Sequence, residues 1–135
     1  MKPTTDLVHD VAAFQEKFGR PFPLHPRPLT GDHRTQAFAH LQEELTEYML
    51  TADEDLEGKF DALIDLIYVA LGCAHNHGFP FKAGWARVHA ANMTKVRPIA
   101  GAPDLKGRPA SVDIVKPEGF IPPALSDLVN QTEAA

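Results

Sequence analysis

The sequence predicts an all-α fold, a small four-helix-bundle-like domain followed by an irregular tail rich in proline and glycine. Apolar residues recur at helical spacing in four segments between about residues 5 and 97. Capping residues, glycine or proline bound these segments. The last part of the chain, residues 98–135, has few apolar clusters. We therefore expect one domain over residues 1–135, with a helical core at about 5–97 and a tail at 98–135.

The first helix is expected to begin at a cap formed by Thr5 or Asp6 and to run to about Phe18, where Gly19 ends it. The stretch that follows, residues 20–31, contains four prolines and predicts a rigid, extended connector.

The second helix is expected near residues 32–50 and the third at about 55–77, with Gly78 as its C-terminal stop. Pro80 fits the first turn of a fourth helix, which ends before Pro98. The core sides of the second and fourth helices are expected to be apolar: Ala37, Phe38, Leu41, Leu45, Tyr48 and Met49 on the second, and Phe81, Trp85, Val88 and Met93 on the fourth.

The tail is expected to hold little regular structure, and the composition of the whole chain excludes several classes of partner. A short hairpin is expected around residues 111–115, and a final helical turn after Pro123. The net charge of −5 and the lack of a basic run argue against a nucleic-acid partner. No apolar run reaches the roughly 18 residues of a membrane span, and the N-terminus is too polar for a signal peptide. One cysteine fits a reducing compartment, so a soluble, cytoplasmic protein is expected.

Five carboxylates lie symmetrically about the turn between the second and third helices. In an antiparallel pair, positions equidistant from the turn face each other, so Glu44 should face Asp65 and Glu47 should face Asp61. Glu43 directly precedes the first of these acids. Like charges this close repel when partly desolvated, and a hard divalent cation with oxygen ligands would neutralise them. A solvated acidic face remains the alternative for the three glutamates.

The third helix is apolar on two opposite sides, which predicts that it is buried. Asp61 and Asp65 occupy the narrow stripe between those sides, where unpaired charges are costly. A chain of this size cannot easily cover both sides, so we expect a homo-oligomer, a dimer or a tetramer, that buries this helix. One side carries Phe60, Leu63, Ile64, Ile67, Leu71 and Ala74, and the other carries Ala62, Leu66, Val69 and Cys73.

The end of the fourth helix offers polar groups for a phosphate or a sugar. Asn92 and Lys95 lie three residues apart, with Arg97 following. Cations that complement the helix dipole are the alternative explanation. Glu-x-x-His, the signature of di-iron bundles, does not occur in the chain, which argues against a ferritin-like oxidase.

Together these motifs resemble the all-α nucleoside triphosphate pyrophosphohydrolase superfamily, which comprises the MazG-like enzymes and phosphoribosyl-ATP pyrophosphohydrolase. The resemblance covers about Val11 to Leu125, and its phosphoribosyl-ATP-pyrophosphohydrolase-like branch is the best match. It is carried by these runs: VAAFQEKFG, EELTEY, FDALIDLIYVALGCAHNHG, FKAGWARVHAANMTKV and the K-x-x-G-F-x-P-P tail from Lys116 to Pro123.

The resemblance implies a MazG-type helical oligomer that uses Mg²⁺, with Mn²⁺ as a substitute, to hydrolyse nucleoside triphosphates between the α and β phosphates. The family's E-x-x-E pair falls on Glu44 and Glu47, and its last metal-binding aspartate falls on Asp65. Glu43 resembles the residue that orients water in some members. The second acidic motif is usually E-x-x-D, which would place an acid where this chain has Ala62, so the ligand role is carried to Asp61 instead.

The resemblance also assigns roles that complete the site. Catalytic roles fall on Glu43, Glu44, Glu47 and Asp65, and metal binding on Glu44, Glu47, Asp61 and Asp65. Asn92 and Lys95, with Lys116 from the tail, supply the groups that bind substrate.

The expected activity is control of the nucleotide pool by a (d)NTP pyrophosphohydrolase that releases (d)NMP and pyrophosphate. Substrates compatible with the sequence include dUTP and dGTP, the latter in a phage pathway from dGTP to dGMP. Hydrolysis of phosphoribosyl-ATP in histidine synthesis is a second hypothesis. A non-catalytic helical oligomer that binds a cation is the third.

Overall fold

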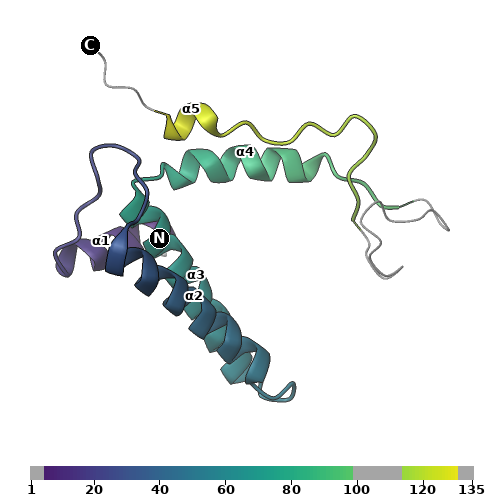
Figure 1. Ribbon diagram of the computed structural model, residues 1–135. Coiled ribbons are helices and arrows are strands. Elements are labelled where there is room, and N and C mark those ends of the chain that lie inside the picture. The colour runs from purple at the N-terminus through teal and green to yellow at the C-terminus, as the bar shows by residue number, and fades with distance from the viewer. Residues whose placement is uncertain (1–4, 99–113, 131–135) are drawn as a thin grey trace, which may run out of the picture.

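The structure, a computed structural model, describes residues 5–98 and 114–130, and within these ranges it contains five helices and no strand (Figure 1). This confirms the all-α class, the four long helices and the helical turn after Pro123. The helices are α1 (Leu7–Lys17), α2 (Gly31–Leu50), α3 (Leu56–His77), α4 (Phe81–Met93) and α5 (Ser126–Val129).

The helix ends follow from local chemistry. Asp6 caps α1, because its carboxylate accepts a hydrogen bond from the His9 amide at 3.1 Å. Asp55 caps α3 in the same way through the Gly58 amide at 2.9 Å. Gly78 ends α3 with φ +72°, a left-handed conformation that an L side chain rarely adopts.

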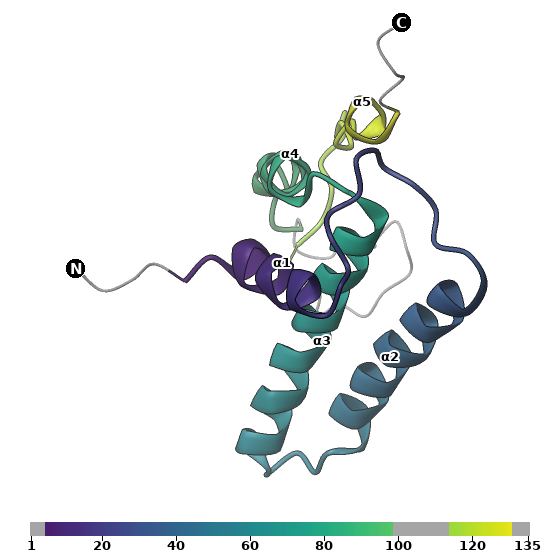
Figure 2. The same cartoon turned by 90° about the vertical axis from the view of Figure 1, so that its left-hand side faces the viewer.

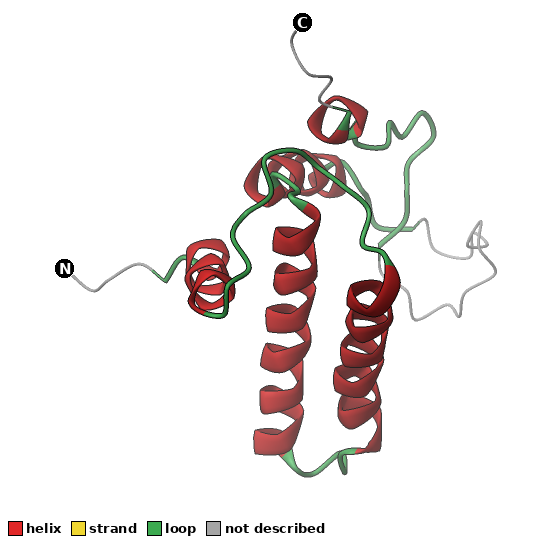
Figure 3. Ribbon diagram, turned by 60° about the vertical axis from the view of Figure 1, so that its left-hand side comes forward, coloured by secondary structure: helices red, strands yellow, loops and turns green. Residues whose placement is uncertain are grey.

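The helices α2 and α3 form an antiparallel hairpin, and α1 packs across α3 (Figures 2 and 3). The buried apolar residues lie mainly where α1 crosses α3. There, Val11 of α1 and Leu71 and Ala74 of α3 are at most 9% exposed, and Ala62, nearer the start of α3, is 1% exposed. The helix α3 is therefore the central element of the chain.

The helix α4 turns away from the hairpin beyond the end of α3 (Figure 1). The described part of the tail runs back along α4, where Val96 and Val115 exchange backbone hydrogen bonds of 3.0 and 2.9 Å. Arg87 of α4 binds the Asp127 carboxylate, with Nη2 2.8 Å from Oδ2. Most of the hairpin expected at 111–115 lies outside the described residues, and Val115 pairs with α4's end.

Several residues expected in the core are exposed within one chain, so this part of the prediction is wrong. Phe38 and Met49 of α2 are 59% and 69% exposed, and Trp85 and Met93 of α4 are 63% and 72% exposed. The reason is that α1 and α2 both pack on α3, whereas α4 does not close the bundle. The side of α3 that bears Phe60, Leu63, Ile64 and Ile67 stays between 41% and 67% exposed.

None of the described helices is both long enough and apolar enough to span a lipid bilayer.

Candidate active site

The carboxylates of α2 and α3 interact across the hairpin. Burial raises the pKa of Glu44 above its ordinary value, and the negative charges of Asp65, Glu47 and Glu43 raise it further. Of the three acids that repel Glu44, only Asp65 belongs to α3, and the antiparallel register of the two helices brings it close to Glu44. The carboxyl group of Glu44 is thus held where its ionised form is disfavoured.

One carboxylate oxygen of Glu44 lacks any partner. Its Oε2 is inaccessible to solvent and accepts no hydrogen bond from the part of the chain that the structure describes. Leaving such a group unsatisfied costs about 1–3 kcal/mol. A proton or a cation would relieve both this cost and the repulsion by Asp65, and oxygen donors of this kind suit a hard divalent cation. The donor set therefore fits a divalent metal ion.

The acids lie near one another but do not form a complete set of metal ligands. Within the described ranges, no group of three or more His, Cys, Asp or Glu residues is arranged to hold a metal ion. Mg²⁺ commonly keeps several waters and takes ligands from substrate phosphates, so a few carboxylates are enough for it.

Asp61 differs from the other acids. It is exposed, and it is not among the groups that raise the pKa of Glu44. The neighbouring Ala62 is 1% exposed. An acid at position 62, where the family motif has one, would therefore lie in the core of this chain. The ligand role of Asp61 stays a prediction.

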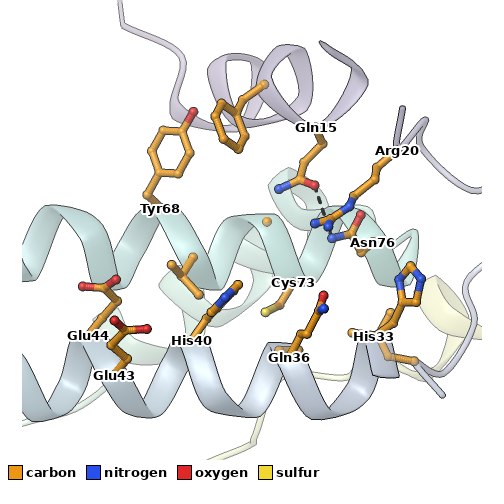
Figure 4. Close-up of a pocket in the computed structure, with 15 residues that line it drawn as sticks. Gln15, Arg20, His33, Gln36, His40, Glu43, Glu44, Tyr68, Cys73 and Asn76 are labelled. Carbon is orange, nitrogen blue, oxygen red and sulfur yellow. Dashed lines mark hydrogen bonds between the residues drawn. The ribbon is translucent and has the colours of Figure 1, made fainter. Parts of the chain in front are cut away.

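A cavity of about 360 Å³ runs from these acids along the groove between α2 and α3, under α1 (Figure 4). Glu43 and Glu44 lie at one end, and Gln15, Arg20, His33 and Asn76 lie at the other. The walls between are mixed: Phe14, Leu29, Gln36, Ala37, His40, Tyr68, Val69, Gly72 and Cys73.

The far end of this cavity was not predicted from the sequence. Gly72 and Asn76 follow Asp65 by seven and eleven residues, so they continue its stripe along α3. That spacing was a usable signal. Gln15 gave no such signal, because its place depends on how α1 crosses α3.

The residues expected to bind substrate do not join the acids within one chain. Asn92 is exposed at the end of α4, which points away from the hairpin (Figure 1). Lys95 follows it, and the ammonium of Lys116 lies 5.0 Å from the ring centre of Phe120 in the tail. None of these three residues lines the cavity. The bundle expected from the sequence would have placed α4 beside the hairpin, and the turn after Gly78 prevents this.

Comparison with known families agrees with this architecture. The model of the family described as "Phosphoribosyl-ATP pyrophosphohydrolase" matches residues 11–92, which contain the five acids and all the residues that line the cavity. No curated protein matches the chain.

The matched family defines the class of reaction. Its members are pyrophosphohydrolases, hydrolases that act on phosphoric anhydrides of nucleotides and generally depend on a divalent metal. Its name states the substrate that the sequence analysis held as the second hypothesis. The chain belongs to the phosphoribosyl-ATP pyrophosphohydrolase family, within the all-α MazG-like superfamily of nucleoside triphosphate pyrophosphohydrolases.

Proposed function

We propose that the protein is a Mg²⁺-dependent (d)NTP pyrophosphohydrolase, with Mn²⁺ as a substitute, that acts on the cytoplasmic nucleotide pool. It cleaves the bond between the α and β phosphates and releases (d)NMP and pyrophosphate. One observation carries the proposal: Glu44, whose buried oxygen has no partner in the described residues and whose charge is repelled by Asp65, lines one end of a cavity of about 360 Å³.

The acids divide the work in this proposal. Glu44, Glu47 and Asp65 would hold the cation, with Asp61 as a further ligand. When bound there, a divalent cation would supply positive charge to offset the charge that builds on the phosphates during cleavage. Glu43 is exposed and lines the cavity, so it is placed to orient the attacking water and to accept its proton. Water forms the new bond to phosphorus, and pyrophosphate leaves.

The basic half of the site must come from a second chain. Asn92, Lys95 and Lys116 lie away from the acids of their own chain, so they can bind the same phosphates only in an oligomer. The exposed side of α3 offers the surface for such an assembly, because contiguous apolar patches mark interfaces. We propose a homo-dimer or a homo-tetramer built on that side.

A substrate panel tests the activity. The protein is incubated with Mg²⁺ and dUTP, dGTP, the other deoxynucleoside triphosphates or phosphoribosyl-ATP, and the products are separated by chromatography. We expect a monophosphate and pyrophosphate from at least one triphosphate. A nucleoside diphosphate with orthophosphate would contradict the assigned bond.

The same panel addresses the two other hypotheses. Hydrolysis of phosphoribosyl-ATP alone would support the role that gives the family its name. Metal binding with no turnover of any compound would support a non-catalytic cation-binding protein.

A further inference from the structure

A pair of carboxamides lies at the end of the cavity that is remote from the acids. Gln15 of α1 is only 8% exposed, and its Oε1 accepts a hydrogen bond of 3.4 Å from Nδ2 of Asn76 on α3 (Figure 4). A bond of this length is weak, and a buried carboxamide needs strong partners. Among the residues that the structure describes, neither the amino group of Gln15 nor the side-chain carbonyl of Asn76 has a hydrogen-bond partner, so both are available to a ligand.

Gly72 makes room for this arrangement. A methyl group added at Gly72 would lie 2.8 Å from Nε2 of Gln15, closer than real contacts allow. The glycine therefore lets the amino group of Gln15 rest directly over α3 beside the cavity. The amide of Gln15 is not among the buried side-chain groups without a partner in the described residues, so its amino group keeps contact with solvent in the cavity, where a ligand can replace the water.

The distance from the acids suits a nucleoside. Gly72 follows Asp65 by seven residues, which is about 10 Å along the helix axis. This is comparable to the reach from an α-phosphate to the far edge of a nucleobase. Phe14 and Tyr68, whose ring centres are 5.4 Å apart, line the cavity between these points and offer aromatic surface to a base.

We infer that Gln15 and Asn76 read the edge of the substrate's nucleobase while its phosphates lie at Glu44. The inference rests on the proposed function for the position of the phosphates. The amino group of Gln15 donates to the base, and the carbonyl of Asn76 accepts from it. Adjacent donors and acceptors are what the pairing edge of a base offers.

This geometry selects against phosphoribosyl-ATP. In that compound N1 of adenine carries a second ribose phosphate, so the pairing edge is blocked. The substrate class is accordingly a nucleoside triphosphate with an unmodified base edge, although the family carries the name of the larger compound.

Calorimetric titration with dGMP, dUMP, dAMP and dCMP in Mg²⁺ tests base reading without any turnover. We expect the wild type to prefer one base over the worst by about tenfold or more. Gln15→Met should weaken the preferred monophosphate by about tenfold and reduce the discrimination to within about threefold, because one hydrogen bond is lost. Gln42→Met is the matched control, since Gln42 is exposed on α2 and does not line the cavity.

Two further measurements separate base reading from a structural effect. Ribose 5-phosphate, which has no base, should bind wild type and Gln15→Met equally. Gln15→Glu keeps the size and the acceptor for Asn76 but replaces the donor, so it should change which base is preferred. Both measurements compare different ligands on the same variant, so a change in the stability of that variant does not affect the comparison.

Different results would refute base reading and the proposed activity. Equal weakening of all four monophosphates, unchanged discrimination in Gln15→Met, or no binding of any monophosphate at millimolar concentration would refute base reading. Faster hydrolysis of phosphoribosyl-ATP than of every simple triphosphate would refute it as well. Loss of discrimination in Gln15→Met without hydrolysis of any triphosphate would instead refute the proposed function and retain the base site.

Discussion

Replacing Glu44 by glutamine should stabilise the metal-free protein and abolish its activity. The carboxylate costs free energy because Oε2 is buried without a partner and because Asp65, Glu47 and Glu43 repel it. Glutamine keeps a polar atom at this position, so the gain comes from removing the charge and its repulsion by the neighbouring acids. Because the residue is partly exposed to solvent, which screens charges, we expect Glu44→Gln to stabilise the chain by only about 1 kcal/mol.

Thermal unfolding in excess chelator measures this gain. For a chain of 135 residues, 1 kcal/mol corresponds to a rise in Tm of about 3–4 °C. Adding Mg²⁺ at about 100 times its Kd should stabilise the wild type by about 2.7 kcal/mol. The variant lacks one ligand and should gain little, so the order of the two stabilities should reverse on adding metal.

The effect should depend on pH. The pKa of Glu44 is raised in the folded state, so between its ordinary value and the raised value the folded chain holds more protons than the unfolded one. Without metal, the wild type should therefore lose stability as pH rises through that interval, and Glu44→Gln should remove this loss. Metal affinity should increase over the same interval, because the cation competes with the proton.

Glu16→Gln provides the control, because Glu16 is exposed on α1 and neither lines the cavity nor raises the pKa of Glu44. It should leave Tm, metal response and turnover unchanged. A Glu44→Gln variant that melts several degrees below the wild type in chelator would show that the carboxylate supports the fold. Repulsion among the acids would then not be what limits the stability of the metal-free protein.

Two other predictions concern the acids and the interface. Asp65→Asn and Glu47→Gln should each reduce turnover by about 100-fold or more with little change in the far-ultraviolet circular dichroism spectrum, because each removes a ligand of the cation; near-normal turnover in either variant would exclude it from the site. Ile67→Glu should dissociate the oligomer in sedimentation experiments, because Ile67 is 52% exposed in one chain and a buried unpaired charge would disfavour association. A wild type that sediments as a monomer at micromolar concentration would rule out the interface.

The sequence sufficed for those features that depend on short stretches of chain. Helical periodicity and the caps at Asp6 and Gly78 place the four long helices, because hydrogen bonds and φ angles at helix ends are local properties. The pairing of Glu44 with Asp65 also followed from the sequence. A short turn forces two helices to run antiparallel, and counting from the turn then gives the register.

Tertiary structure decided which faces are covered and what lies beside the acids. Amphipathic patterns indicate that a face is apolar but not which element packs on it, so Trp85 of α4 was expected in the core and is 63% exposed. The position of Gln15 depends on where α1 crosses α3, and that crossing is set by the fit of side chains around Gly72. The acids could be read from the chain because they face each other across one turn, whereas Gln15 and Asn76 lie 61 residues apart and meet only when α1 packs on α3.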